Sequence, residues 1–205
     1  VTAAMTGSVG LSDFFAKFPQ RAVDVGICEE HAAVFCAAMA AQGFKPYFAV
    51  YSTFLQRSFD EVVLDICSQN LPVTLCIDRA GISGADGETH QGVFDLSYLS
   101  LMPNMAIAVP KDAEEFAEML KFSAGYSGPL AIRYPRASYH TFGKCKKIEL
   151  GKWEKLSDGD GKVAILACGE RAIWRAVCAA ERVQKECGVR PSVINACFVK
   201  PLDEG

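Results

Sequence analysis

Hydrophobic positions along the chain alternate between two patterns. Short apolar runs with little polar alternation predict buried β-strands, and stretches with apolar residues at helical spacing predict amphipathic helices. Strands that read this way and are separated by helices are typical of a parallel sheet covered on both faces. We therefore expect an α/β fold, a mostly parallel sheet with helices on both faces. The predicted strands are 22–27, 47–51, 73–77, 105–109, 130–134, 163–167 and 193–196, and the predicted helices are 11–18, 29–42, 53–69, 112–124 and 171–186.

The pattern weakens after residue 137 into lysines, glycines and short polar stretches, and regular alternation resumes at 162. This predicts one α/β domain over 1–140, a linker over 141–161 and the start of a second α/β unit over 162–205. A single crossover is too little for a stable parallel-sheet domain. We therefore expect a chain that is cut at its end, and at its beginning too.

Composition narrows the class of protein. The chain has 205 residues and a net charge of −3 without a basic block, which argues against a nucleic-acid partner. No apolar run approaches the ~20 residues that span a bilayer, so we expect no membrane partner. Its nine cysteines form no Cys-x-x-Cys pair and lie mostly in apolar runs, which favours reduced core thiols and a cytoplasmic location.

One loop after a predicted strand gathers side chains of unlike chemistry. It follows the apolar run 73–77 and carries four glycines within 78–92, which let the backbone approach a ligand. Arg79, Asp86 and His90 bring a fixed cation, a carboxylate and a titratable imidazole into the same few residues. A structural loop rarely needs all three, so the pattern predicts a ligand site.

Two other predicted strand ends carry candidate groups. Glu29 begins the helix after 22–27, where a carboxylate either serves a ligand or complements the helix dipole. Phe54 and Arg57 share a helix face just after Tyr51. A flat ring and a planar cation there suit an aromatic, charged ligand, although Phe54 fits a core position equally well.

A fourth strand end carries Arg133 and Arg136, which straddle Pro135. Two such guanidinium groups suit bidentate capture of a phosphate or carboxylate, but a solvated pair is equally common. Because parallel strands bring their carboxyl ends to one edge of the sheet, we expect all these groups to converge there.

Together the motifs resemble those of the 1-deoxy-D-xylulose-5-phosphate synthases, thiamine-diphosphate enzymes related to transketolase. The resemblance runs from about residue 2 to residue 205. The pairing of the YSTFLQR segment with the DRAG loop makes it specific within the larger superfamily. The matching segments are DVGICEEHA, KPYFAVYSTFLQRSFDEVVLD, LPVTLCIDRAGISGADGETHQGVFDLSYL, PN, RYPR and FVKPLD.

The resemblance implies that the chain holds the central pyrimidine-binding domain and the start of the C-terminal domain. The full enzyme condenses pyruvate with glyceraldehyde 3-phosphate and releases CO2, on the way to isoprenoid precursors, thiamine and pyridoxal. Glu29 then matches the catalytic glutamate that hydrogen-bonds the aminopyrimidine of thiamine diphosphate, with Ile27 and Phe54 beside the same ring. The acceptor-substrate residues implied are Tyr51, Arg57, Asp86 and His90, with Arg79 and Arg136 for the phosphate and His90 also as a catalytic proton relay.

The resemblance also implies Mg²⁺, held by a Gly-Asp-Gly motif and a later Asn of an N-terminal domain that this sequence does not contain. Gly159-Asp160-Gly161 precedes a predicted strand and Asn195 lies inside one, so we interpret the first as a turn and expect no metal ligand in this chain. We expect the full-length enzyme to be a homodimer, and this fragment alone to be inactive and to bind the cofactor poorly.

Two alternative functions stay open at this stage. One is a transketolase-like or 2-oxoacid dehydrogenase β-like subunit, and the other is a non-catalytic sugar-phosphate-binding domain. The sequence also departs from the family pattern, with Glu30 where Gln is common and Ala137 where Gly is usual. The effect of the second negative charge beside Glu29 does not follow from the sequence.

Overall fold

The chain forms two compact units in the computed structural model, which describes residues 1–136 and 140–205. The first unit comprises Val1–Ile107 and Ser123–Arg136, and the second comprises Ala108–Phe122 and Ala137–Gly205. Each unit is thus discontinuous in sequence, whereas the division at 140 and 161 expected from the sequence is continuous. The departure at Ala137 lies outside the described residues.

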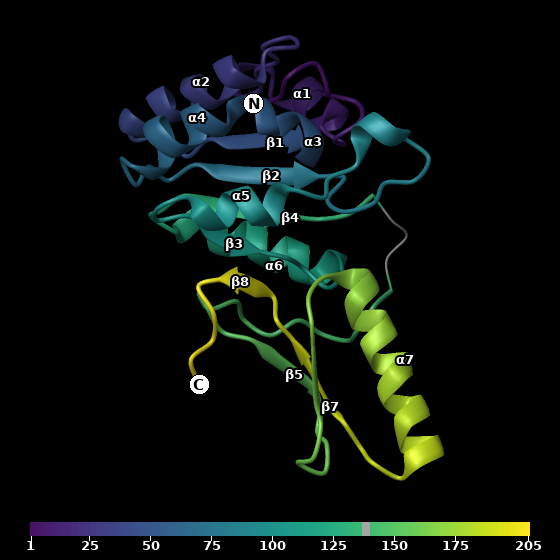
Figure 1. Ribbon diagram of the computed structural model, residues 1–205. Helices are drawn as coiled ribbons and strands as arrows, with labels where there is room; N and C mark the ends of the chain where they lie inside the picture. Colours follow the sequence, from purple (N-terminus) through teal and green to yellow (C-terminus); the bar gives the residue numbers. More distant parts are fainter. Residues whose placement is uncertain (137–139) are drawn as a thin grey trace. The chain divides into compact units, whose positions relative to one another are not determined.

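Four strands of the first unit are neighbours in one sheet, in the order β1-β2-β4-β3. Strand β2 pairs in parallel with both β1 and β4, so that Tyr51 lies opposite Asp78 and Ile77 opposite Arg133. The carboxyl ends of β1 and β2 lead to the same side, where α3 and the loop after β2 lie (Figure 1). The strands are β1 (Tyr47–Tyr51), β2 (Thr74–Asp78), β3 (Ala106–Ala108) and β4 (Leu130–Arg133).

Strand residues of this sheet are buried almost without interruption, as in a sheet covered on both faces. The mostly parallel α/β fold expected from the sequence is confirmed. Helix α2 begins at Glu29 and buries small side chains such as Ala33 and Ala37, and it ends shortly before Gly43 at φ +87°. The helical segments up to β3 are α1 (Ser12–Lys17), η1 (Pro19–Arg21), α2 (Glu29–Ala41), α3 (Ser52–Leu55), η2 (Gln56–Ser58), α4 (Phe59–Glu61), η3 (Val62–Cys67), η4 (Glu88–His90) and α5 (Asp95–Leu101).

The predicted strand at 22–27 is wrong. Only Asp24 makes a bridge, to Thr2, and the rest of the segment is irregular. The carboxylate of Asp24 accepts hydrogen bonds from the backbone N–H groups of Ala4 at 2.7 Å and Gly26 at 3.0 Å. These local bonds, with Gly26 at φ +76°, compete with a sheet ladder and shape a loop instead.

The predicted helix at 53–69 is present but subdivided. It runs through α3, the 3₁₀ turn η2, α4 and the π-helical segment η3. Leu55 and Ile66 are both fully buried, and their separation is close to three turns of a regular α-helix, so their burial does not mark the changes of helical period. Apolar spacing alone detects the helix but not these adjustments.

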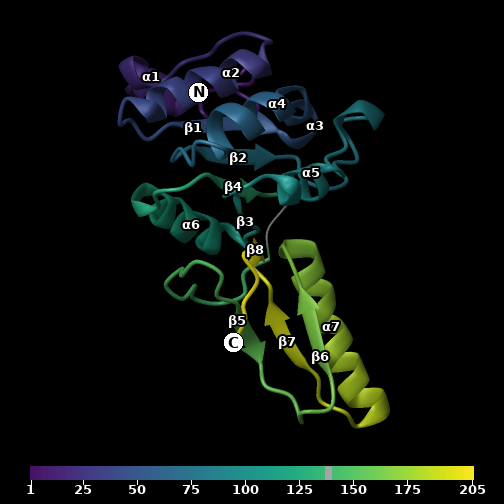
Figure 2. The ribbon, with the colours of Figure 1, turned by 60° about the vertical axis from the view of Figure 1, so that its left-hand side comes forward.

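The second unit contains a three-stranded sheet in the order β5-β7-β6. Strands β6 and β7 are parallel and β5 is antiparallel to β7, and α7 lies alongside them (Figures 1 and 2). Strand β5 falls within the range 141–161 that was expected to be a linker. The elements are β5 (Glu154–Ser157), β6 (Ala164–Ala167), α7 (Glu170–Cys187), β7 (Ser192–Asn195) and β8 (Phe198–Lys200).

The core of the second unit forms between α7 and this sheet, where Ile173 of α7 and Val193 of β7 are buried. Helix α7 ends at Gly188, which adopts the left-handed conformation at φ +67°. Helix α6 (Ala113–Gly125) begins with the predicted cap, because Asp112 Oδ1 accepts the N–H of Glu115 at 2.8 Å.

In the part of the chain that the structure describes no disulfide occurs, but only Cys36, Cys67, Cys76 and Cys197 are buried, so the expectation of core thiols holds for four of the nine cysteines. Burial raises the pKa of Cys36, Cys76 and Cys197 to about 12. Within residues 1–136 and 140–205, every helix is too short or too polar to cross a membrane.

Candidate functional site

A buried carboxylate and an arginine form the first part of the site. Glu29 begins α2 and is only 2% exposed, because the helix start turns its side chain into the unit. Arg57 lies in η2, and its Nη1 donates to Glu29 Oε2 at 2.9 Å and to Oε1 at 3.1 Å. The Arg57 side chain is 49% exposed. A half-exposed cation thus neutralises the buried acid.

Three rings lie next to this ion pair. Tyr51 and Phe54 stack with their centroids 5.6 Å apart at an interplanar angle of 10°. The imidazole of His90 meets Phe54 edge-on at 5.2 Å and Tyr51 at 6.2 Å. The guanidinium carbon of Arg57 lies 5.2 Å from the centre of the Phe54 ring, a cation–π distance. Phe54 therefore connects the Glu29–Arg57 pair to His90.

A second arginine continues the arrangement on the other side of Tyr51. The guanidinium carbon of Arg79 lies 4.1 Å from the centre of the Tyr51 ring. Its Nη1 donates to the Ser8 carbonyl at 2.9 Å, and its Nε faces Asp86 Oδ2 at 3.3 Å. Arg79 also has φ +56°, an uncommon conformation for a residue with a side chain, which these contacts hold in place.

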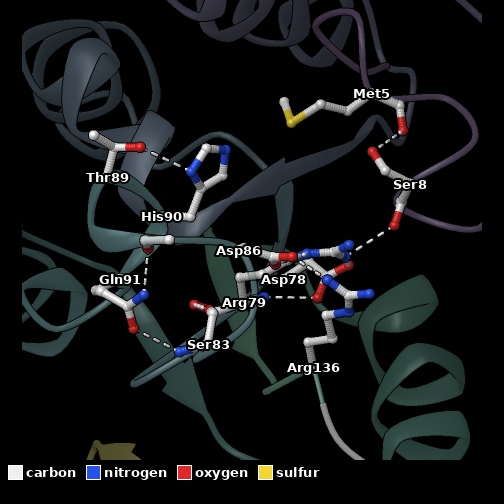
Figure 3. Close-up of polar contacts among 11 residues, drawn as sticks. Met5, Ser8, Asp78, Arg79, Ser83, Asp86, Thr89, His90, Gln91 and Arg136 are labelled. Atoms are coloured by element: carbon white, nitrogen blue, oxygen red, sulfur yellow. Dashed lines mark hydrogen bonds and ion pairs between the residues drawn. The ribbon is translucent and has the colours of Figure 1, made fainter.

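Asp86 joins two arginines that are far apart in sequence. Its Oδ2 pairs with Arg79 and its Oδ1 accepts a hydrogen bond from Arg136, which follows β4. Figure 3 shows both guanidinium groups directed at this carboxylate. Arg136 is half exposed, whereas the Arg79 side chain is nearly buried. Only Arg136 of the two offers solvent-accessible donors without rearrangement.

The loop between Arg79 and His90 is fixed at both ends. Gly81 and Gly92 exchange backbone hydrogen bonds of 2.7 and 2.8 Å, which close the loop at its base. A Cβ on Gly92 would lie 2.3 Å from the Arg79 carbonyl oxygen, so the close approach requires glycine. Thr53 of α3 donates to the Thr89 carbonyl at 3.0 Å and holds the loop beside Phe54.

These contacts form one continuous set, which we call the strand-end site. The predicted site residues therefore lie together at the carboxyl end of the sheet, as expected from its parallel strands. Ile27 is the exception, because its side chain is 79% exposed and makes no contact with the others that the structure records. The strand-end site comprises Glu29, Tyr51, Phe54, Arg57, Arg79, Asp86, His90 and Arg136.

Two supporting carboxylates were not given a role by the sequence analysis. Asp78, the last residue of β2, pairs with Arg79 Nη1 at 2.5 Å and accepts the Arg79 N–H at 2.6 Å. Burial raises the pKa of Asp78, although Arg79 acts in the opposite direction. Asp95 at the start of α5 pairs with Arg133 Nε at 2.9 Å. The role of Asp78 was predictable from its position directly before Arg79 in the sequence. The pairing of Asp95 with Arg133 was not, because the two residues are far apart in the chain.

The residues present fit one end of thiamine diphosphate. A buried carboxylate beside an aromatic ring suits the polar edge and the flat face of an aminopyrimidine, and exposed Ile27 lies two residues before Glu29 in the chain. The metal end has no such match within 1–136 and 140–205, where no cluster of three potential ligands occurs. Asp160 is in a turn, as predicted, because its carboxylate accepts the N–H groups of Lys162 and Arg190 at 3.1 Å each.

Comparison with protein families gives one match over most of the chain. The profile described as "Transketolase, pyrimidine binding domain" matches residues 1–141. Similar proteins include the 1-deoxy-D-xylulose-5-phosphate synthases of Clostridium perfringens strain SM101 and Caldanaerobacter subterraneus subsp. tengcongensis, each 52% identical over 206 residues. The chain spans about a third of the length of these relatives, 33% for the Clostridium perfringens protein.

Solved structures resemble the chain over nearly its whole length. A split-gene transketolase in an inactive β4 tetramer is 28% identical, with a TM-score of 0.87, and the match covers 99% of this chain and 66% of the other. A transketolase from Campylobacter jejuni, at 19% identity and a TM-score of 0.78, shares the fold, with 97% of this chain and 32% of that one covered. The similarity extends beyond residue 141 into the second unit.

Proposed function

Because the chain belongs to the transketolase family through its pyrimidine-binding domain, we propose that it is part of a 1-deoxy-D-xylulose-5-phosphate synthase, a thiamine-diphosphate-dependent transferase. Identity of 49–52% along essentially the whole chain supports this more specific assignment. The proposed reaction joins pyruvate to glyceraldehyde 3-phosphate with loss of CO2. The observation that carries the proposal is the continuous strand-end site, in which a buried acid, a ring stack and two arginines contact one another in series.

Glu29 is the proposed catalytic carboxyl group of this unit. Its buried oxygens are the place for a hydrogen bond with a ring nitrogen of the aminopyrimidine, while Phe54 packs on the ring and Ile27 flanks it. When bound, thiamine diphosphate supplies a nucleophilic carbon that takes up pyruvate and stabilises the charge left after CO2 departs. The protein's share is to orient the ring and to hold a proton at the Glu29 carboxyl.

The acceptor side uses the other groups of the strand-end site. Arg136 and Arg79 are proposed to bind the phosphate of glyceraldehyde 3-phosphate, since guanidinium groups keep their charge and offer paired donors. Tyr51, Arg57 and Asp86 line the same region. His90, whose Nδ1 lies 2.9 Å from Thr89 Oγ1, is proposed to pass a proton to the oxygen that becomes negative when the acceptor adds.

The remaining features of the full enzyme are proposals as well. Mg²⁺ and the diphosphate would be held by a separate domain, because the described residues offer no ligand cluster. A homodimer and a cytoplasmic location follow from the family resemblance. The chain by itself is proposed to be inactive, in keeping with the split-gene relative, whose β4 tetramer is described as inactive.

The decisive experiment replaces Glu29 by Gln in a full-length synthase that carries this sequence. We expect CO2 release from pyruvate and glyceraldehyde 3-phosphate to fall by roughly 10²–10⁴-fold, the usual range for a lost acid–base group. Glu118→Gln is the matched control, since Glu118 pairs with Lys121 on the surface of α6 and lies outside the site. The circular dichroism spectrum of both variants should match the parent protein.

The same experiment separates the alternatives when deoxyxylulose phosphate is measured beside CO2. Unchanged turnover in Glu29→Gln would favour a non-catalytic sugar-phosphate-binding domain. Turnover of a 2-oxoacid without formation of deoxyxylulose phosphate would favour a dehydrogenase β-like subunit.

A further inference from the structure

The ion pair between Arg57 and Glu29 conflicts with the proposed use of both residues. In the part of the chain that the structure describes, Arg57 is the only charged partner of Glu29. One nitrogen, Nη1, contacts both carboxylate oxygens, at 3.1 and 2.9 Å. A ring nitrogen that bonds to Glu29 must approach the same oxygens, and the carboxylate is almost fully buried. The guanidinium and the aminopyrimidine therefore compete for one acceptor.

Electrostatics strengthens the conflict. The Arg57 guanidinium lies 2.9 Å from Glu29 Oε2 and compensates the charge of this buried carboxylate at the position that a ring nitrogen would need. Removing the cation without a replacement would leave a buried, uncompensated charge, which is strongly unfavourable. The exchange is thus favourable only when another donor takes the place of Arg57.

Arg57 has room to make this exchange. Its side chain is half exposed, and its guanidinium lies over the Phe54 ring. The Phe54 ring also contacts the imidazole of His90, and the guanidinium of Arg79 lies over the neighbouring Tyr51 ring. Within residues 1–136 and 140–205, the other donors of Arg57 have no recorded partner. A guanidinium that turns away from Glu29 can keep its aromatic contact while it presents these donors to an anion.

We propose that Arg57 is a switch residue that pairs with Glu29 when the pyrimidine position is empty and turns to the anionic group of the acceptor substrate when it is filled. This inference rests on the proposed function. The ligand class is a phosphate or carboxylate anion. The switch links the two binding events, because each ligand removes the competitor of the other.

Linkage gives a measurable consequence. If an anion draws Arg57 away from Glu29, the anion tightens cofactor binding, and the cofactor tightens anion binding by the same factor. Couplings of this kind typically amount to about 5–150-fold. Without the Arg57 cation the coupling disappears, and the cofactor binds at least as tightly as before when no anion is present.

The test uses apo full-length synthase carrying this sequence. Calorimetric titration with thiamine diphosphate and Mg²⁺ is run with and without glycerol 3-phosphate, an unreactive analogue of the acceptor, so the readout is affinity and not turnover. We expect the analogue to lower the cofactor Kd about 5-fold or more in the parent protein, and to leave it unchanged in Arg57→Met. Arg57→Lys keeps the charge and should retain part of the coupling.

Arg182→Met is the matched control, because Arg182 also pairs with a glutamate but lies on the exposed face of α7. Coupling that persists in Arg57→Met overturns the switch, as does weaker cofactor binding by that variant in the absence of the analogue. If Arg57→Met does not fold, Arg57→Gln is measured in its place with the same two criteria. Failure of the parent protein to bind thiamine diphosphate would instead overturn the proposed function.

Discussion

Arg79 lies over the ring of Tyr51, with its guanidinium carbon 4.1 Å from the ring centre, and pairs with two carboxylates at once. Asp78 and Asp86, its partners, are both mostly buried. Arg79 is therefore a structural centre of the site as much as a candidate phosphate ligand.

We predict that Arg79→Met lowers the free energy of unfolding by about 3 kcal/mol or more, since it leaves the poorly solvated Asp78 without its recorded cation and Asp86 with Arg136 alone. Urea unfolding of the variant measures this loss. Adding Asp78→Asn to Arg79→Met should recover part of it, because the uncompensated charge is then removed. A loss below about 1 kcal/mol would show that solvent replaces the arginine, contrary to the burial observed.

Arg136 offers the contrasting case. Its side chain is half exposed, and within residues 1–136 and 140–205 its recorded ion-pair partner is Asp86. Arg136→Met should change the free energy of unfolding by less than about 1 kcal/mol, as for other exposed ion pairs. In a full-length synthase it should raise KM for glyceraldehyde 3-phosphate by roughly tenfold or more, the effect of one lost charge-assisted hydrogen bond of about 1.5–3 kcal/mol. An unchanged KM would remove Arg136 from the phosphate site.

The base of the Arg79–His90 loop predicts a steric effect. Gly92→Ala places a methyl group 2.3 Å from the Arg79 carbonyl oxygen and 2.5 Å from Ser52 Cβ, so backbone has to move. We expect a destabilisation of about 1–3 kcal/mol, typical of overpacking, in thermal or urea unfolding. Gly125→Ala is the control, because a Cβ there meets nothing within 4 Å and lies in α6, where alanine is favoured. Equal stability of the two variants would contradict the close approach.

Thiol reactivity should follow burial. At pH 8 a thiol reagent is expected to modify the exposed Cys28, Cys178 and Cys187 first. Cys36 and Cys76 should react only on unfolding, because burial raises their pKa to about 12 and blocks access. Mass spectrometry of timed samples with and without urea measures the order. Early modification of Cys76 in the native protein would contradict its position in β2.

The lowered pKa of Asp203 leads us to expect a structural change in the second unit at acid pH. Hydrogen bonds from the Trp153 N–H and from Lys152 lower the pKa of Asp203 to about 2. A lowered folded-state pKa means that this group stabilises the fold above its ordinary value near 3.8, and that the stabilisation is lost as the pH falls from there towards 2. Trp153 fluorescence should therefore change between pH 4 and 2, and Asp203→Asn should abolish this change.

Much of the site was predictable because a parallel sheet turns sequence order into spatial order. Phe54, His90 and Arg136 follow β1, β2 and β4, and strands that point the same way bring them to one edge. Glu29 follows an irregular segment and reaches the site as the first residue of α2. The predicted boundaries of β1 were correct to the residue, since Tyr47–Tyr51 is a continuous apolar run that is followed directly by the polar residues Ser52 and Thr53.

The errors have physical causes that a pattern does not contain. The hydrophobicity of the segment 22–27 is typical of a strand, but the Asp24 carboxylate accepts hydrogen bonds from nearby backbone N–H groups, and the segment is irregular. Ile27 is exposed as a result. The pairing of Arg57 with Glu29 depends on which of several acids the arginine reaches in space. The strand β5 escaped notice because its alternation of half-buried and exposed residues lies within a lysine-rich stretch.

The strand-end site contains as many guanidinium groups as carboxylates once Asp78 is counted with it, since Arg57, Arg79 and Arg136 face Glu29, Asp86 and Asp78. Such internal neutralisation leaves little long-range attraction for anions in solution. Recognition of the proposed phosphate ligand would then depend on contacts made after arrival, by exchange of partners within existing pairs, and discrimination among anionic metabolites would be decided by geometry at short range.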